Sequence, residues 1–521
     1  MGFMDELKKA IDENTFCYTE NGAKMYAGTG NALLDLNYAV SSLRNASIGE
    51  VIEKFACALA EDEHLAIKWL FFAGDVRGGM GERRLFRICL GYLADVRPEL
   101  VKKLLPLVAE YTRYDNLFVL LTGKLKDDVC ALIAERLKED ERLMGEGKTI
   151  SLLCKWLPSV QTYNEDNQLY IGIILEYLGM KKSEYRKMLA RMREYIKVTE
   201  RLISDGKWSE VDYSTVPSKA NLVYAEAFMK HDKERRAKYL KAVEEGKAKI
   251  NGGTLFPYEL VHRYNQECTF LHFVKLKMGL SGFYKPIDTV EELWKALPDY
   301  VGANGSTLCV ADGSGSMTDR VSKNSSLTAL EVAQSLAIYF AERASGGFNN
   351  KYITFSHTPQ FVNLGKAKNL MEKIVIANAH CEVDDTNIEA VFDLVLKVAT
   401  SSKKAAASVP ANILILSDME FNSCATDASG NHMTDDLPLF DVIAKKYADA
   451  GVKMPRLIFW NICGRTLGIP LRTNEKGLAL VSGFSPSIFK MVASGELDPY
   501  KCLLEVLNGE RYKMVDNALI G

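Results

Sequence analysis

Five oxygen-bearing side chains in the second half of the sequence have the types and spacing of a site for a hard metal ion. In the stretch CVADGSGSMTD, Asp312, Ser314 and Ser316 alternate with two glycines after a short apolar run. Thr386 follows in VDDTNIEA, and Asp418 ends the apolar run NILILSD. Carboxylates and hydroxyls suit Mg²⁺, which keeps several waters and needs few protein charges. We therefore expect a divalent-cation cofactor, Mg²⁺ before Mn²⁺ or Ca²⁺.

These side chains meet only if the segments that carry them end at one edge of a sheet. From about residue 305, short β-rich runs alternate with amphipathic helical segments. The predicted strands are 307–312, 351–356, 412–418, 456–462 and 478–484, and the clearest helices between them are 327–344, 388–400 and 440–450. This alternation predicts a mostly parallel sheet with helices on both faces. Ligands of such sheets bind beyond the carboxyl ends of the strands.

The first 300 residues follow a different pattern. Apolar residues recur there at spacings of three and four, as in PELVKKLLPLVAEY, with short breaks at glycine and proline. Helices of this length with short breaks predict stacked, HEAT-like helical pairs. The fold class is thus α plus α/β. Its predicted parts are an all-α helical-repeat domain at 1–300, an α/β domain at 303–495 and a helical segment at 496–521.

The strand-end pattern resembles the metal-ion-dependent adhesion site of the von Willebrand factor A family, over about residues 303 to 495. In that family, the DxSxS residues, a threonine and an aspartate surround one divalent cation, and an acidic group of a partner completes the coordination. The resemblance implies that the five residues above are the ligands, some of them through water. Asp384 and Asp385 stand where relatives often have glycines, and such extra acid would raise cation affinity or displace Thr386.

Motifs over most of the chain, roughly residues 30 to 500, resemble the Ro-type ribonucleoproteins, which join a TROVE helical-repeat domain to a von Willebrand A domain. In order, they are DVRGGMGERRLF, KWLPS, DGSGSM, LSDMEF, IFWNI and LALVSGF. The closest resemblance is to uncharacterised domain-of-unknown-function relatives of that group. The helical repeats of Ro-type proteins close into a ring that binds small structured RNAs and the ends of misfolded RNAs. The resemblance implies a helical ring or arc here and a small non-coding or misfolded RNA as partner.

Two basic stretches have the charge that RNA binding needs. Residues 181–201 hold eight Lys or Arg against three Glu, and residues 230–241 hold six basic against two acidic residues. The candidate phosphate-binding residues are Lys181, Lys182, Arg186, Lys187, Arg191, Arg193, Lys230, Arg235 and Arg236. Tyr185, Tyr195 and Tyr239 lie among them and could stack on bases. The alternative is a pair of solvated helix faces with ordinary ion pairs.

The composition says more about the cellular compartment of the protein than about its binding partner. The net charge of −2 selects no partner class, and eleven cysteines without CxxC spacing indicate reduced thiols. No run of about 18 apolar residues occurs, so we expect no membrane partner and a cytoplasmic location. A monomer is expected.

The sequence predicts a binding protein and not an enzyme. No nucleophile is paired with a general base, and His357 and His380 lie in no metal motif. We therefore assign no catalytic residues and favour a non-enzymatic RNA-binding protein with a divalent-cation site. One alternative is a metal-dependent protein-interaction scaffold that binds an acidic partner and no RNA. Another is a metal-assisted enzyme that acts on RNA.

Overall fold

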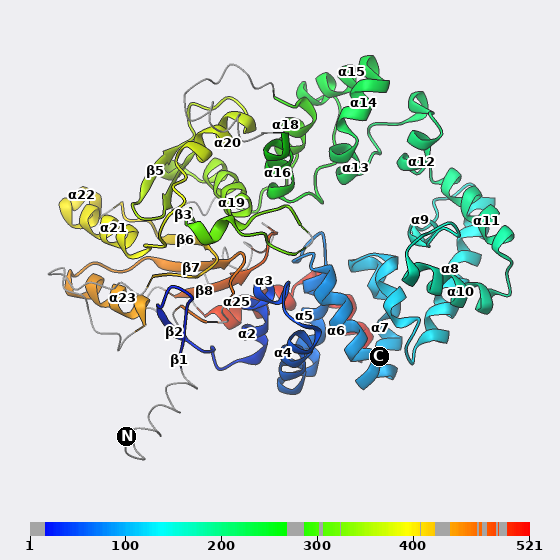
Figure 1. The fold of residues 1–521 in the computed structure, drawn as a ribbon, viewed down its shortest axis with the longest axis horizontal. Coiled ribbons are helices and arrows are strands. Elements are labelled where there is room, and N and C mark those ends of the chain that lie inside the picture. Colours follow the sequence, from blue (N-terminus) through cyan, green and yellow to red (C-terminus); the bar gives the residue numbers. More distant parts are fainter. Residues whose placement is uncertain are drawn as a thin grey trace. The chain divides into compact units, whose positions relative to one another are not determined.

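The chain folds into two compact units in the computed structural model (Figure 1). The sheet unit comprises Met1–Asp62 and Leu255–Asn508, and the helical unit comprises Glu63–Thr254 and Gly509–Gly521. The structure describes residues 16–267, 286–301, 306–323, 325–406, 408–422, 438–465, 468–470, 477–485, 488 and 498–520.

This division differs from the predicted boundaries at 1–300, 303–495 and 496–521. The first 62 residues and residues 255–300 belong to the sheet unit, and residues 509–521 belong to the helical unit. The reason is physical: an amphipathic helix pattern shows that one face is buried but not which partner buries it. The N-terminal helix α2 (Ala32–Tyr38), for example, packs against strand β8 (Leu478–Ser482) of the sheet.

The sheet has six strands in the order β5-β4-β3-β6-β7-β8. Its other strands are β3 (Thr307–Asp312), β4 (Lys351–Phe355), β5 (Gln360–Asn363), β6 (Asn412–Ser417) and β7 (Arg456–Asn461). All neighbours run parallel except β4 and β5. The five predicted strands are confirmed, and β5 was missed because its four residues, QFVN, include only one buried side chain.

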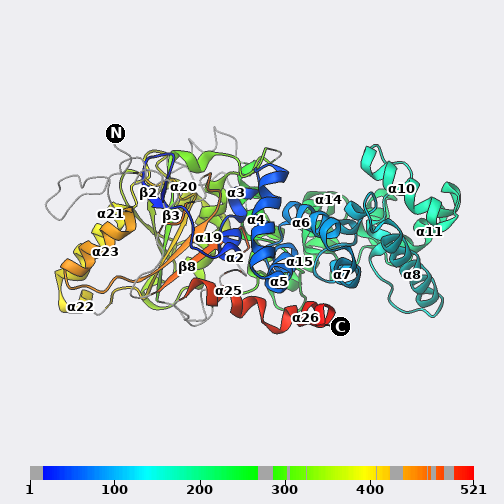
Figure 2. The ribbon, with the colours of Figure 1, turned by 90° about the horizontal axis from the view of Figure 1, so that it is seen from below.

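Helices cover both faces of the sheet, as predicted (Figure 2). Strand side chains alternate between the faces, and Ile415 and Phe459 lie in the core cluster that also holds Phe392 of α21 (Glu389–Ser401) and Phe440 of α23 (Leu439–Asp449). On the other face, α19 (Ala329–Arg343) contacts β3, β4 and β6. The remaining elements of this unit are β1 (Phe16–Tyr18), β2 (Lys24–Tyr26), α3 (Val40–Leu43), α4 (Ile48–Glu61), α16 (Pro257–Glu267), α18 (Asp288–Lys295), η4 (Gly315–Thr318), η5 (Gly346–Phe348), α20 (Leu370–Ala379), α22 (Lys403–Ala406) and α25 (Pro499–Leu507).

The helical unit is built from helices that pack on their neighbours in the chain, as the predicted repeat requires. In order, they are α5 (Glu63–Gly74), α6 (Arg83–Val96), α7 (Pro98–Tyr111), η1 (Tyr114–Leu120), α8 (Lys126–Gly145), α9 (Leu153–Trp156), α10 (Glu165–Leu178), α11 (Lys182–Tyr195), α12 (Thr199–Ser204), η2 (Trp208–Glu210), α13 (Ser218–Val223), α14 (Ala225–His231), α15 (Lys233–Glu244), η7 (Glu510–Tyr512) and α26 (Lys513–Ile520). α5 packs on α6, α6 on α7 and α14 on α15, while α26 returns to α5 and α7. Within the described ranges, no helix has the length and apolar character needed to cross a membrane.

The motif RGGMGE connects α5 to α6 and is built for close packing. A Cβ atom on Gly79 would lie 2.0 Å from the Phe72 carbonyl oxygen, and one on Gly78 would lie 2.6 Å from Cδ of Arg511. A larger residue is therefore excluded at Gly79, and a larger residue at Gly78 would clash with Arg511 of the C-terminal segment. The motif is thus a closely packed helix–helix connection.

Asp75, at the start of this connection, anchors the C-terminal segment. The Asp75 side chain is fully buried and accepts hydrogen bonds from Nε and Nη2 of Arg511, the latter at 2.7 Å. The Tyr512 hydroxyl donates to the same carboxylate at 3.2 Å. A buried carboxylate is tolerated only with such partners.

Arg511→Ala should therefore destabilise the helical unit by roughly 3 kcal/mol, because it leaves the Asp75 charge buried without its cation. Denaturant unfolding followed by circular dichroism measures this. The matched control is Lys513→Ala, which removes an exposed cation paired only with Glu510 and should change little. Equal stability of the two variants would show that the Asp75–Arg511 contact is not needed.

Candidate metal centre and nucleic-acid interface

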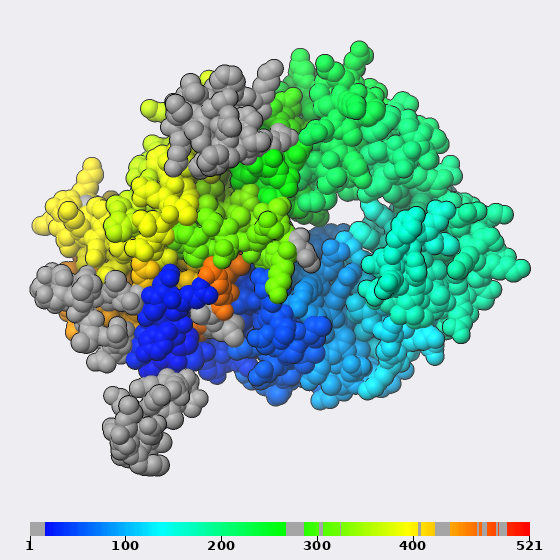
Figure 3. All heavy atoms as spheres, viewed as in Figure 1, coloured from blue at the N-terminus to red at the C-terminus, as the bar shows by residue number. Residues whose placement is uncertain are grey.

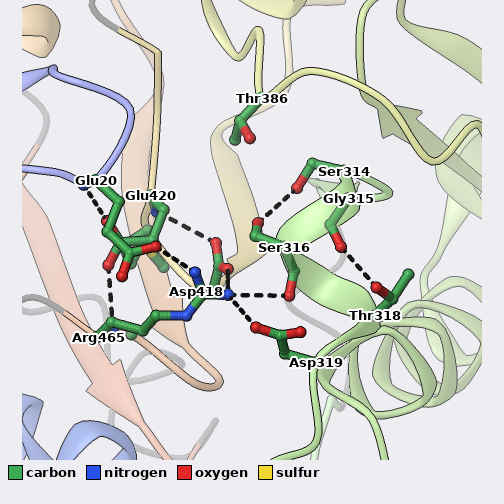
Figure 4. A network of polar contacts seen from close by, with 12 residues as sticks. Glu20, Ser314, Gly315, Ser316, Thr318, Asp319, Thr386, Asp418, Glu420 and Arg465 are labelled. Carbon is green, nitrogen blue, oxygen red and sulfur yellow. Dashed lines mark hydrogen bonds and ion pairs between the residues drawn. The ribbon is translucent and has the colours of Figure 1, made fainter.

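The strand-end cluster, defined as Asp312, Ser314, Ser316 and Asp418, forms where β3 and β6 end side by side. Asp312 is the last residue of β3; its Oδ1 accepts the Ser314 amide at 2.9 Å and its Oδ2 accepts the Ser417 hydroxyl at 2.5 Å. The hydroxyls of Ser314 and Ser316 lie 3.1 Å apart (Figure 4). Parallel pairing of β3 with β6 thus brings together four of the five predicted ligands.

Asp418 presents the least satisfied oxygen of this cluster. It follows β6 directly and precedes Met419, whose φ of 66° is the left-handed conformation that non-glycine residues seldom adopt. Its Oδ1 accepts the Glu420 amide at 3.2 Å, whereas its Oδ2 is buried and accepts no hydrogen bond within the described residues. A buried carboxylate oxygen without a donor is costly unless a cation reaches it.

Two carboxyl groups are buried at this edge of the sheet, and the pKa of each is raised above its ordinary value. Burial raises the pKa of Asp312 to about 6, although hydrogen bonds from Ser417 and Ser314 oppose the shift. Burial and the charge of Asp312 raise the pKa of Asp418 to about 7, while the Ser316 hydroxyl acts in the opposite direction. Both shifts mean that the ionised forms of these two carboxyls are disfavoured at this buried edge.

Thr386, the fifth predicted ligand, lies on a separate loop beside the cluster (Figure 4). The Gly315 amide donates to the Asp384 carbonyl at 2.8 Å, which ties this loop to the DxSxS turn. Thr386 is buried, and its hydroxyl accepts a hydrogen bond from Nδ2 of Asn21 at 3.3 Å. Asp384 and Asp385 are both exposed. The loop thus lies beside the strand-end cluster, but within the described residues no hydrogen bond joins Thr386 to that cluster.

Arg465 is a neighbour of this cluster that the sequence patterns did not indicate. Its Nη2 donates to Asp319 at 2.7 Å and to the Ser316 carbonyl at 3.3 Å, and lies 3.9 Å from Oδ2 of Asp418. Its Nη1 pairs with Glu20 from the N-terminal hairpin (Figure 4). The only available signal was a charged residue shortly after the predicted strand IFWNI, which is too common to interpret.

The donor set fits a divalent cation held by few protein charges. Within the described ranges, no three His, Cys, Asp or Glu side chains form a metal-binding group. Any cation here would be held by two carboxylates and by hydroxyls, with the unpartnered Oδ2 of Asp418 as the strongest candidate ligand. Asp312, Ser314, Ser316 and Asp418 would hold the ion, which would neutralise the two carboxylates and polarise a bound anionic group.

A cavity of about 890 Å³ lies in the sheet unit beside the cluster. Asp319 and Arg465 line it together with Lys54, Arg320 and Lys323. The two histidines considered earlier stand apart from the cavity. His357 lies 3.6 Å from Asp385 and both are more than half exposed, while Nδ1 of His380 lies 2.8 Å from the Ile376 carbonyl oxygen.

Five of the candidate RNA-binding residues are exposed on and beside α11 and form a basic surface; Figure 3 shows the helical unit that carries this segment as a space-filling view, coloured by residue number. The five residues are Lys181, Lys182, Arg186, Lys187 and Arg191, of which Arg191 pairs with Glu141. Next to this surface lies a hollow of about 670 Å³, whose lining includes Lys155, Arg186, Arg193 and Arg201 with Glu200 and Asp205.

The Arg193 side chain makes hydrogen bonds within the protein and is therefore not available to RNA. Its guanidinium donates to the carbonyls of Cys154 and Leu157, at 2.8 and 2.6 Å, and to the Ser159 hydroxyl. Tyr185 is also unavailable to bases, because it is fully buried and donates to the Pro158 carbonyl. Residue spacing shows which residues share one face of a helix, but it does not show whether that face is buried in the protein or exposed to solvent.

The second predicted patch is mostly unavailable to RNA. The prediction for Arg236 is wrong: its side chain is fully buried among the rings of Tyr213, Phe228 and Tyr239, and burial lowers its pKa to about 10. Arg235 donates to the carbonyls of Trp208, Ser209 and Val211. Lys230 remains exposed. Arginines near aromatic residues in the sequence proved to be core-packing groups here.

The exposed tyrosines of the two patches are partly occupied by main-chain contacts. Tyr195 is 37% exposed and donates to the Lys148 carbonyl at 2.8 Å, and Tyr239 donates to the Lys249 carbonyl at 2.7 Å.

Comparisons with known proteins place the chain among uncharacterised relatives. Residues 306–507 match the family described as a domain of unknown function, DUF7788, and residues 174–306 match a second domain of unknown function, DUF2828. The chain is 29% identical over 530 residues to the uncharacterized protein L728 of Acanthamoeba polyphaga mimivirus, covering 94% of this chain and 87% of that protein. The predicted likeness to domain-of-unknown-function proteins is confirmed, whereas the von Willebrand A and TROVE assignments stay predictions.

A solved structure resembles the chain at a low level. It is the crystal structure of the Ro (RSR) protein of Deinococcus radiodurans, with a TM-score of 0.41 and 12% identity over 91% of this chain and all of that one. Such a similarity is too low to assign a function.

Asp418→Asn should raise the stability of the metal-free protein and abolish its response to Mg²⁺ or Mn²⁺. The substitution removes one of two buried like charges, and it also removes the cation's main ligand. The wild type should gain about 2.7 kcal/mol when the cation is present at a hundred times its dissociation constant. Thermal unfolding with and without cation measures both effects. Asp449→Asn, at an exposed position, is the control, and a persistent cation response in Asp418→Asn would contradict the assignment.

The stability of the metal-free protein should fall as pH rises from about 4 to 7. Both carboxyls have folded-state pKa values, about 6 and about 7, above those of the unfolded chain, so the folded state binds more protons in this window. Cation binding should strengthen over the same range, because protons and cation compete for the same oxygens. Unfolding midpoints measured between pH 4.5 and 8, with EDTA and with Mg²⁺, give both trends; parallel curves would refute the competition.

Proposed function

We propose that the protein is a non-enzymatic RNA-binding protein whose helical unit binds RNA phosphates and whose sheet unit holds a divalent cation. The observation that carries the RNA part is the exposed basic surface of α11 beside a hollow whose lining includes charged side chains. Lysine and arginine side chains in such positions release counterions when they meet phosphates, and this release drives binding.

The cation part of the proposal is supported by the two buried carboxylates of the strand-end cluster. Burial raises the pKa values of both groups, and the charge of Asp312 adds to the shift of Asp418; the positive charge of an Mg²⁺ ion would favour their ionised forms. The site lies at the carboxyl end of a parallel sheet, where ligands of this fold class bind. In this proposal, the cation stabilises the sheet unit and leaves a coordination position for an anionic group of a partner.

Binding and not turnover is proposed because the two carboxylates of the strand-end cluster serve as cation ligands in this proposal and are then not available for proton transfer. Neither His357 nor His380 reaches the strand-end cluster, and the nearby Arg465 is a permanent cation that cannot act as a base. The small structured or misfolded RNAs that Ro-type proteins bind are the class of ligand that we propose for this chain.

A protein-interaction scaffold without RNA is the second candidate. It is favoured by the cavity of about 890 Å³ beside the cation cluster, which is large enough for part of a peptide. Its lining holds four basic side chains, Lys54, Arg320, Lys323 and Arg465, against the three acidic ones of Glu50, Glu53 and Asp319, a small basic excess that would suit an acidic group of a partner.

Removing two exposed charges from α11 should weaken the binding of a structured RNA by roughly tenfold and flatten its salt dependence. The variant is Lys182→Gln with Lys187→Gln, because both side chains are exposed and have no structural partner among the described residues. Fluorescence anisotropy at several salt concentrations measures both quantities.

The matched control is Lys103→Gln with Lys138→Gln, which removes the same charge from exposed positions on other helices of the same unit. Equal weakening in both double variants would mean that only net charge matters. If the wild type binds no structured RNA at low salt, the proposed RNA function fails, and cation-dependent capture of an acidic peptide would then support the scaffold.

A further inference from the structure

Three arginines of the helical unit converge on a single carboxylate. Arg87, in the second turn of α6, donates from Nη2 to Oδ2 of Asp115 at 2.9 Å and from Nε to Asn116 at 2.7 Å. Arg113 donates from Nε to Oδ1 of Asp115 at 2.8 Å and from Nη2 to Oδ2. Nη1 of Arg83, the first residue of α6, lies 3.8 Å from the same Oδ2. Arg83, Arg87 and Arg113 are called the arginine cluster below.

The cluster holds more positive charge than its carboxylate can neutralise. The pKa of Asp115 is low although burial acts to raise it, because all three guanidiniums act on this carboxyl. Burial and the charges of Arg113 and Arg87 lower the pKa of Arg83. Asp166 is a second acid at the edge, since it and Arg87 both affect the pKa of Tyr170. Three cations still outnumber two carboxylates.

Arg83 is the member most available to a ligand. Its side chain is 49% exposed, and the 3.8 Å contact with Asp115 is its sole polar contact in the described part of the chain. That distance exceeds a hydrogen bond, so its planar fork of donors can turn toward a phosphate. Arg87 and Arg113, about one-third exposed, are held in place by Asp115.

An aromatic ring adjoins the cluster. The guanidinium carbon of Arg113 lies 3.7 Å from the ring centroid of Trp156, in α9, and the ring is half-buried. Guanidinium groups stacked on tryptophan keep their edge donors directed outward. Phosphate-binding groups beside an aromatic face are the combination with which proteins hold single-stranded nucleic acid.

We propose that Arg83, Arg87 and Arg113 form a second RNA contact that binds a backbone phosphate of a single-stranded segment, next to Trp156. This inference rests on the proposed RNA function but concerns a site on α6 and η1, outside both basic stretches of the sequence. Asp115 orients the two inner arginines, and Arg83 supplies the mobile donor group.

The test is binding of a labelled single-stranded RNA to the full chain, measured by anisotropy at several salt concentrations. We expect Arg83→Gln to weaken binding by about tenfold and to lower the slope of log K against log salt by about 0.7. Arg83→Lys should keep the slope but recover only part of the affinity, because lysine lacks the fork. Arg97→Gln is the control, since Arg97 follows the other end of α6, is 53% exposed and pairs with Glu63.

The outcomes separate the two proposals. If the wild type binds RNA and Arg83→Gln binds it with the same affinity, the arginine site is overturned. The same holds if Arg97→Gln loses as much affinity as Arg83→Gln. In both cases the proposed RNA binding of the protein remains. Absence of RNA binding by the wild type overturns both. Circular dichroism melting of each variant checks folding, and Arg83→Lys keeps the site testable if Arg83→Gln is unstable.

Discussion

Two carboxylates are buried side by side at the carboxyl ends of adjacent parallel strands. Their two negative charges, buried close together, are the constraint on which the end of this sheet depends. Asp312 is already hydrogen-bonded through both oxygens, whereas Oδ2 of Asp418 is buried without a donor among the described residues. Burial raises the pKa values of both groups, and the charge of Asp312 adds to the shift of Asp418. Such a pair is stable at neutral pH only with added positive charge, and the serine hydroxyls beside it suit a hydrated divalent ion.

Arg465 supplies part of the missing charge from 3.9 Å, while it also pairs with Glu20 and Asp319. The N-terminal hairpin is drawn into the same network, because the Glu20 amide donates to the Glu420 side chain and Asn21 contacts Thr386. Glu20 and Asn21 therefore help to shape the end of the sheet. In the helical unit, the buried carboxylate of Asp75 is paired directly with the guanidinium of Arg511, which donates a hydrogen bond to it.

The sequence was sufficient to predict the parallel sheet, its five main strands and four of the clustered polar residues, because continuous apolar runs and strand-end polar residues are local signals. It could not predict Arg465, whose role depends on a contact across 146 positions with Asp319. Nor could it separate surface from core arginines: Lys182 and Arg236 both lie in basic stretches, yet only Lys182 is exposed. Domain boundaries failed for the same reason, since helix patterns do not reveal which partner a helix packs against.

Anomalous diffraction from crystals soaked in Mn²⁺ tests the buried-carboxylate interpretation most directly. We expect one strong anomalous peak bonded to Oδ2 of Asp418 and near the hydroxyls of Ser314 and Ser316, with the guanidinium of Arg465 no closer to Asp418 than 3.9 Å. A fully ordered strand-end cluster without any peak, in which Arg465 instead donates hydrogen bonds to Asp418, would contradict it. The carboxylate pair would then be neutralised by the protein itself.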